Sequence, residues 1–147
     1  MSAVESGGFG VRRASASEAD TLIGIDAIAV EGNGERQASI RRWCRQGLAV
    51  VAEDASGPLG YCVVEYTFFE QGFVTMLMVA PSARGRGVGQ RLLDDAASSC
   101  TTAKLFTSTN VSNQPMQRLL QTSGWSPVGL LHGLDEGDPE LFYLCRR

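Results

Sequence analysis

A glycine-rich segment between a strand-like and a helix-like stretch constrains this chain more than any other feature. Residues 84–90 read Arg-Gly-Arg-Gly-Val-Gly-Gln and follow the apolar stretch 73–79. Apolar residues then recur at helical spacing, at Val88, Leu92, Leu93, Ala96, Ala97 and Cys100. Alternating glycines let backbone N–H groups face one point, and the start of a helix adds unpaired N–H groups and a positive dipole end. The segment therefore predicts an anion cradle that suits a pyrophosphate.

Two common phosphate-binding motifs do not fit this segment. A P-loop ends in Gly-Lys followed by Ser or Thr, and Lys104 is the only lysine of the chain. A dinucleotide fingerprint, Gly-x-Gly-x-x-Gly, fits Gly85 and Gly87 but needs its third glycine at position 90, where the chain has Gln90. That fingerprint also belongs to an early strand–helix–strand unit, whereas four strand-like stretches precede this segment. The segment therefore belongs to neither class.

Periodicity and turn residues predict seven strands, at residues 9–15, 48–53, 60–69, 73–79, 104–109, 125–134 and 140–145. Short turns at Gly57-Pro58 and Gln71-Gly72 join the strands between 48 and 79. Such short connections predict an antiparallel meander, in which 73–79 is a central strand covered on both faces.

Four helices are expected between these strands. The first runs from a Ser17 N-cap to about residue 30, and the second runs from Glu35 to a C-terminal cap at Gly47. The third follows the glycine segment and makes the one parallel crossover, and the fourth starts near Pro115. The predicted fold class is α+β, with a central mixed, mostly antiparallel sheet of about seven strands and helices on both faces.

The 147 residues have the size of one domain, so we expect a single domain over 1–147 with a loose tail at 1–8. The 16 acidic and 13 basic residues and the pI of about 5.1 argue against nucleic acid as a partner. The longest apolar runs have five residues, whereas a membrane helix needs about 20. The N-terminal stretch lacks the basic start and apolar run of a signal peptide, so we expect a cytoplasmic protein without membrane contact.

No metal site is predicted. Cys44, Cys62, Cys100 and Cys145 contain no Cys-x-x-Cys pair and are expected to be free thiols, and His132 is the only histidine. A zinc cluster or a Ser-His-Asp triad is therefore not expected.

Two stretches of the sequence resemble the GNAT N-acetyltransferase superfamily. Arg84-x-x-Gly87-x-Gly89, after a strand that ends Leu77-Met78-Val79-x-Pro81, is similar to the acyl-CoA-binding signature of that superfamily. Asn113, followed by a helix that ends at Gly124-Trp125, is similar to its second signature, where members usually have Gly-Phe. The predicted order of elements also matches this fold, so the resemblance covers about residues 9–146.

The resemblance implies a site for acetyl-CoA as the acyl-donor cosubstrate. Backbone groups of Leu77, Met78 and Val79 would bond the pantetheine arm where the central strands separate. A backbone N–H there would polarise the thioester carbonyl. Asn113 would contact the cofactor near its acyl end. The pyrophosphate would lie against Arg84, Gly85, Arg86, Gly87, Val88, Gly89 and Gln90.

The acid and the base that many GNAT members use are missing here. Many members have a tyrosine seven residues after the asparagine, where this chain has Leu120. Some have a glutamate five residues before it, where this chain has Ser108. Other members carry an acid on the central strand, near the positions of Thr75 and Met76, and neither of these residues is acidic. A thiol with a pKa of about 8.5 leaves without full protonation, but an amine with a pKa of about 10 must lose a proton before it attacks.

Glu65 is the best substitute for the missing base. It lies in the strand beside the central strand, among mostly apolar residues. Tyr66, Glu70 and Tyr143 are weaker candidates. The alternative for Glu65 is a solvent-facing residue on a half-exposed strand.

The sequence therefore predicts an acetyl-CoA-dependent N-acetyltransferase that acetylates a primary amine by direct attack in a ternary complex. The alternative is a non-catalytic acyl-CoA-binding module or sensor, which the missing tyrosine and glutamate leave open. Acids at 135, 136, 138 and 140 on one side of the expected acceptor cleft, with Glu31 and Glu35 opposite, predict a cationic small molecule or peptide as acceptor. An ordinary solvated turn is the other interpretation of those acids. The acceptor, the acyl-chain preference and the choice between monomer and homodimer are not determined by the sequence.

Overall fold

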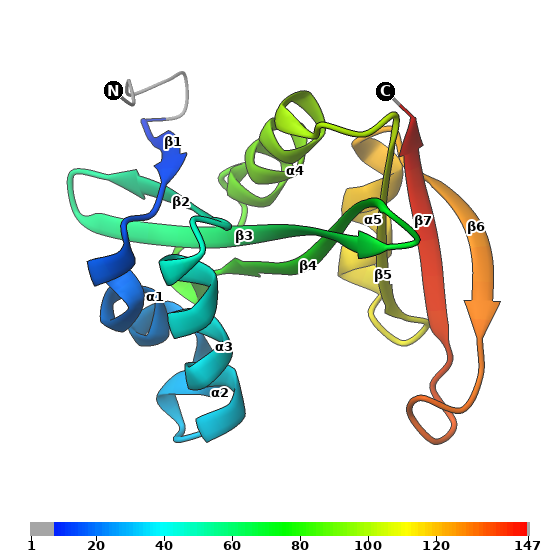
Figure 1. The fold of residues 1–147 in the computed structure, drawn as a ribbon, viewed down its shortest axis with the longest axis horizontal. Coiled ribbons are helices and arrows are strands. Elements are labelled where there is room, and N and C mark those ends of the chain that lie inside the picture. The colour runs from blue at the N-terminus through cyan, green and yellow to red at the C-terminus, as the bar shows by residue number, and fades with distance from the viewer. Residues whose placement is uncertain (1–7, 147) are drawn as a thin grey trace.

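The computed structural model describes residues 8–146, which form one sheet with helices on both faces (Figure 1). Of the tail expected at 1–8, residues 1–7 lie outside the described residues. The strands are β1 Gly10–Arg13, β2 Ala49–Asp54, β3 Gly57–Phe68, β4 Gln71–Val79, β5 Lys104–Asn110, β6 Ser126–Leu131 and β7 Glu140–Arg146. The helices are α1 Ala19–Ile25, α2 Ala27–Val30, α3 Gly34–Arg45, α4 Val88–Ser99 and α5 Gln114–Thr122.

The sheet is mixed, and its seven strands follow the order β1-β2-β3-β4-β5-β7-β6. Neighbouring strands pair antiparallel except β4 and β5, which pair in parallel across the connection made by α4. This confirms the predicted α+β class and its single parallel crossover.

Each face of the sheet has its own hydrophobic core, because successive side chains of a strand point to opposite faces. Figure 1 shows α1, α2 and α3 on one side of β3 and β4, and α4 on the other. The first core contains Leu22, Ile40, Trp43, Tyr61 and Val63. The second core, under α4 and α5, contains Cys62, Leu92, Leu93, Leu105 and Leu120. The covering helices thus make two separate environments on one sheet.

The first predicted helix is broken, which corrects the prediction of one helix from Ser17 to about residue 30. A 3-10 turn, Ala16–Glu18, comes first and is capped by Ser15, whose backbone N–H donates to the Glu18 carboxylate at 2.7 Å. Helix α1 then ends at Ile25, and Asp26 is the N-cap of α2. The Asp26 side chain accepts from two backbone N–H groups of α2, and this local competition for backbone donors restarts the helix.

Asp26 also joins two further elements through its second carboxylate oxygen. This oxygen accepts from the Tyr61 hydroxyl of β3 and from an Arg36 nitrogen of α3, both at 2.7 Å, and the residue is 0% exposed. Burial raises the pKa of the Asp26 carboxyl, but the hydrogen bonds from Tyr61, Arg36 and the backbone outweigh burial and hold the pKa below its ordinary value. The network fixes α1, α2 and α3 against the sheet.

The sequence prediction placed both turns of the meander two residues later than the structure has them. Gly57 and Pro58 belong to β3, and Gln71 and Gly72 belong to β4. The β3–β4 turn consists of Phe69 and Glu70, with φ of 50° and 64°. This left-handed region disfavours bulky side chains, and two-residue hairpin turns usually carry Asn-Gly there. The prediction followed the nearby glycines Gly57 and Gly72 and therefore placed the turns at the wrong residues.

We expect the Asp26→Ala variant to lose about 3–5 kcal/mol in the free energy of unfolding, because it leaves buried donors and a charge without a partner. The control is Asp20→Ala, which removes an exposed ion pair with Arg41 and should cost about 1 kcal/mol or less. Because folding lowers the Asp26 pKa, its stabilisation is complete above about pH 4 and is lost as the pH falls through the lowered value. Urea unfolding at pH 7 and pH 3 measures the loss in each variant and its dependence on pH. Equal losses in the Asp26→Ala and Asp20→Ala variants would contradict the role of Asp26.

Candidate active site

Strands β4 and β5 separate partway along their length. Gly72, Phe73 and Val74 of β4 pair with Leu105, Phe106 and Thr107 of β5. Beyond these positions, the structure as described shows no further pairing between them, although β4 continues to Val79 and β5 to Asn110. The last link is the Thr107 hydroxyl, which donates to the Val74 carbonyl at 2.9 Å. The sheet therefore opens after Val74, and β5 leaves the facing edge of β4 uncovered.

A bulge at Thr75 coincides with this opening. Val63 of β3 pairs with Met76, and the next residue, Val64, pairs with Val74, so Thr75 has no partner in the β3–β4 ladder. A bulge bends the strand and shifts the alternation of its side chains. Val74 and Leu77 accordingly both face the core under α4 and α5, although three positions separate them.

A cleft of about 620 Å³ adjoins the opening on the side of α4 and α5. The first residues of both helices line it, so both positive dipole ends lie beside the same space. This combination favours an anion with an apolar extension. The lining residues are Leu77, Val79, Ala83, Arg84, Gly85, Gly87, Val88, Gly89, Gln90, Asn113, Pro115, Met116 and Leu119.

The three glycines of the segment have two different functions in the fold. Gly85 and Gly87 have φ of 81° and 82°, and no atom lies within 4 Å of where a Cβ would be. They give the chain a left-handed conformation before α4 and leave its backbone uncovered. A Cβ on Gly89 would lie 3.0 Å from Leu119 Cδ2, so the third glycine lets α4 approach α5. The sequence pattern alone does not distinguish these functions.

The structure places most of the predicted cofactor residues around this cleft, and two of them outside its lining. The Met78 side chain packs against the core under α1 and α3. Arg86 pairs with Asp54 at 3.1 Å and lies over the Phe9 ring, 5.9 Å from its centre. Asn113 lines the cleft and is also the N-cap of α5, since its side-chain oxygen accepts from the Met116 N–H at 3.2 Å.

Glu65 lies on the opposite face of the opening. It pairs with Phe73 across β3 and β4, and its carboxylate accepts from the Thr75 hydroxyl at 2.7 Å. The predicted base is thus held beside the bulge residue itself. Glu70 is exposed in the β3–β4 turn.

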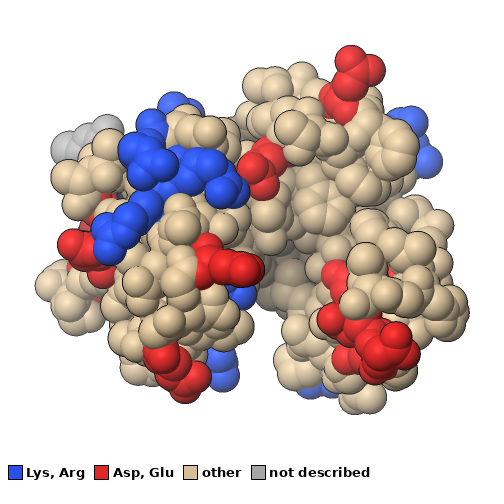
Figure 2. Space-filling model, turned by 60° about the horizontal axis from the view of Figure 1, so that its bottom comes forward, with Lys and Arg blue, Asp and Glu red and all other residues tan. Residues whose placement is uncertain are grey.

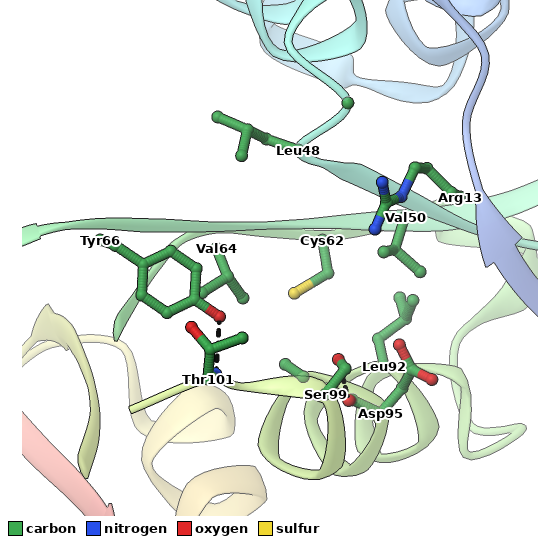
Figure 3. A pocket seen from close by; sticks show the side chains of 12 residues that line it. Arg13, Leu48, Val50, Cys62, Val64, Tyr66, Leu92, Asp95, Ser99 and Thr101 are labelled. Atoms are coloured by element: carbon green, nitrogen blue, oxygen red, sulfur yellow. Dashed lines mark hydrogen bonds between the residues drawn. The ribbon is translucent and has the colours of Figure 1, made fainter. Parts of the chain in front are cut away.

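Tyr66 and Tyr143, the weaker candidates, lie on the α4 and α5 face of the sheet but are not among the described residues that line the cleft. Tyr66 lines a separate cavity of about 210 Å³ between β2, β3 and α4, where its hydroxyl accepts from the Thr101 N–H at 3.1 Å (Figure 3). Tyr143 is 0% exposed in the core under α5, and its hydroxyl has no hydrogen-bond partner among the described residues. Leu120, at the position where the resemblance would lead one to expect a tyrosine, is buried in the same core.

Glu140 is a carboxylate beside the part of β5 that has no β4 partner, and the sequence did not assign it to catalysis. It starts β7, and its side chain accepts from the Ser108 hydroxyl of β5 at 2.6 Å. Ser108 stands at the position where the resemblance noted in the sequence would lead one to expect a glutamate, so β7 supplies a carboxylate next to that position. The contact crosses 32 residues, and only the β5–β7 register reveals it.

The acidic β6–β7 loop is held against β5 by neutral donors. Asn110 donates to Asp135 at 2.9 Å, and the Ser112 N–H donates to Asp138 at 3.0 Å. These bonds leave the negative charges in place, and no ion pair among residues 8–146 involves an acid of this loop. Figure 2 shows acidic side chains on both sides of a hollow between two lobes of the surface.

No group of three or more potential metal ligands gathers within the described residues, and the four cysteines are free thiols. No described helix combines the length and apolarity that crossing a membrane requires. The cytoplasmic location stays a prediction.

Comparison with known proteins gives matches over the whole of this arrangement. The acetyltransferase (GNAT) domain family matches residues 45–127, more than half of the chain. A GNAT-family acetyltransferase from Bacillus cereus is 32% identical, with 95% of this chain and 97% of that one covered and a TM-score of 0.88.

Two more distant structures share the fold. A proposed acetyltransferase from Salmonella typhimurium, solved with its cofactor acetyl-CoA, is 18% identical over 94% of this chain and 93% of its own, with a TM-score of 0.74. Diaminobutyrate acetyltransferase from Paenibacillus lautus, in complex with L-2,4-diaminobutyric acid and coenzyme A, is 14% identical over 94% and 95%, with a TM-score of 0.75. No curated protein matches the sequence at a significant level.

Proposed function

This chain belongs to the GNAT acetyltransferase family, and from that premise we propose that it transfers an acetyl group from acetyl-CoA to a primary amine by direct attack in a ternary complex. Residues 1–147 form a single domain in this proposal. The observation that carries it is the opening between β4 and β5, which joins the cleft at α4 and α5 to the face that holds Glu65.

The cleft suits acetyl-CoA, which would supply the acetyl group as an activated thioester. Gly85 and Gly87 leave backbone N–H groups and the α4 N-terminus uncovered for the pyrophosphate, and Arg84 lines the cleft beside them. Leu77, Val79 and Met116 give the cleft an apolar wall for the pantetheine arm. Backbone groups of β4 beyond Val74 would bond the arm's amides in place of the missing β5 partners.

Proton removal is assigned to Glu65, directly or through one water. The carboxylate lies beside the bulge, on the face opposite the cleft, so it is reached by an amine that enters from that face. The Thr75 hydroxyl holds one oxygen and leaves the other able to accept a proton. Glu140 is the second carboxylate near the opening and is bound to Ser108.

The acceptor is a cation in this proposal. The acids of the β6–β7 loop, and Glu31 and Glu35 before and in α3, would concentrate amines in the hollow between them. The same field stabilises an ammonium group and opposes its deprotonation. The rim acids therefore attract the amine, and the base beside the opening takes its proton.

A non-catalytic acyl-CoA sensor is the second candidate. The burial of Leu120 in the core favours it, because no acid replaces the family tyrosine at that position. Coenzyme A release from acetyl-CoA in the presence of a panel of primary amines distinguishes the two candidates. Release that depends on an amine supports the enzyme, and tight acetyl-CoA binding without release for every amine supports the sensor.

We expect Gln90→Glu to weaken acetyl-CoA binding by about tenfold or more, because it puts a negative charge among the anion-binding N–H groups. The substitution is almost isosteric, and an acid in the first turn favours helix formation, so the melting temperature should not fall. Gln90→Met is the neutral control. Calorimetry should show that S-acetylpantetheine, which lacks the pyrophosphate, binds both variants equally; a matching loss for this compound would place the pyrophosphate elsewhere.

We expect Glu65→Gln to lower the rate about 10²- to 10⁴-fold while acetyl-CoA affinity stays unchanged. The limb of the pH–rate profile that belongs to the base should disappear. Tyr143→Phe is the control and should leave the rate unchanged. If Glu140→Gln removes that limb and Glu65→Gln does not, the base is Glu140 and the assignment of Glu65 is wrong.

We expect kcat/KM for a polyamine or basic peptide to fall as salt rises, because salt screens exposed charges over about 8 Å at physiological strength. The double variant Asp135→Asn with Glu136→Gln should flatten this dependence. A neutral or anionic acceptor preferred at every salt concentration would contradict the cationic acceptor.

A further inference from the structure

One half of a sheet face is covered by helices, and the other half carries uncovered aromatic rings. Helices α1 and α3 pack on β2 and β3 at one end of this face. At the other end, four half-buried phenylalanines from β3, β4, β5 and β7 contact one another. We call this cluster the aromatic floor; it consists of Phe68, Phe73, Phe106 and Phe142.

The aromatic floor is continuous. The centre of the Phe68 ring lies 4.8 Å from that of Phe73, 5.2 Å from Phe106 and 5.9 Å from Phe142, onto which it stacks at 16°. These separations are typical of favourable aromatic pairs. None of these four described rings belongs to either of the two helix-covered cores, and each is half-buried, so an apolar surface stays accessible on the central strands.

The floor adjoins the groups that the proposed function uses. Phe73 pairs with Glu65, and Phe142 pairs with Ser108, the partner of Glu140. Both carboxylates therefore border the aromatic surface on the face from which an amine would enter. A ligand that fits has a positive charge beside a large apolar group, since ring faces also attract cations.

Phe69 gives a second, independent observation. Its φ of 50° places a bulky residue in the left-handed region, and its side chain is 84% exposed, touching Phe68 edge-on at 5.0 Å. This position is unfavourable for the free protein in both backbone conformation and exposure. Beyond its edge-on contact with Phe68, the Phe69 ring would gain contacts from a ligand that lies on the floor.

We propose that the acceptor amine carries an aromatic or bulky aliphatic group a few bonds from its nitrogen, and that this group lies on the aromatic floor with Phe69 at its edge. This inference rests on the proposed acetyltransferase activity and names the substrate class of the same site. The floor selects among amines, while Glu65 and the rim acids act on any amine.

Matched amines test this proposal. The kcat/KM for 2-phenylethylamine should exceed that for ethylamine by about 10- to 100-fold, as expected for burial of an added ring. 1,4-Diaminobutane, which adds a charge in place of a ring, should not show this gain. Equal kcat/KM for 2-phenylethylamine and ethylamine, or a preference for the diamine, would overturn the proposal and leave the acetyltransferase assignment standing. No release with any amine would instead count against the proposed function, and acetyl-CoA affinity measured by calorimetry separates the two failures.

Two variants locate the preference on the floor. Phe142→Ala should remove most of the gain in kcat/KM that 2-phenylethylamine shows over ethylamine. Phe69→Gly should weaken the same gain while the melting temperature stays equal or rises, because glycine relieves the left-handed strain. A purely structural Phe69 would instead lower the melting temperature and treat both amines alike, which would count against the proposal. Leu130→Ser is the control on the other face: Leu130 is 51% exposed, and its register partner Leu141 packs toward α5. If this control changed the preference as much as Phe142→Ala, the floor would not be the selecting surface.

Discussion

The bulge at Thr75 is the constraint on which the candidate site depends. One unpaired residue in β4 bends the strand, and the parallel ladder with β5 stops at the preceding residue. A regular ladder to Val79 would close the sheet, and the cleft under α4 and α5 would then have no connection with Glu65. The connection between the two faces thus comes from an interruption in backbone hydrogen bonding, and the Thr75 side chain also holds the carboxylate that lies next to it.

The two faces of the sheet separate two kinds of recognition. The face under α4 and α5 presents backbone N–H groups and two helix starts, which suit a constant ligand with phosphates. The opposite face presents side chains of four strands, and these can change without altering the backbone of the cleft. Asp26 stabilises the covered half of that face, since it joins α2, α3 and β3 away from the opening.

The sequence predicted what local pattern controls and missed what strand register controls. The glycine segment between strand and helix located the cleft, and apolar periodicity located the strands and the crossover. The β3–β4 turn was misplaced because its two residues, Phe69 and Glu70, are not of the types that favour left-handed turns. The break at Asp26 was missed because the apolar stripe continues past it, whereas the Asp26 side chain caps a new helix at that point. Neither Glu140 beside Ser108 nor the aromatic floor has a signature along the chain, because each joins residues from different strands.

The contact between Gly89 and Leu119 links the glycine segment to a helix that is distant in the sequence. A methyl group at position 89 would lie 3.0 Å from Leu119 Cδ2, so the Leu119 side chain would have to give way by a few tenths of an ångström. A smaller residue at position 119 would restore the space. Positions 89 and 119 should therefore covary among related chains, with alanine at the first accompanied by a shortened side chain at the second. Directed evolution that varies α5 alone would accordingly also alter the spacing of the helix that begins at the anion cradle.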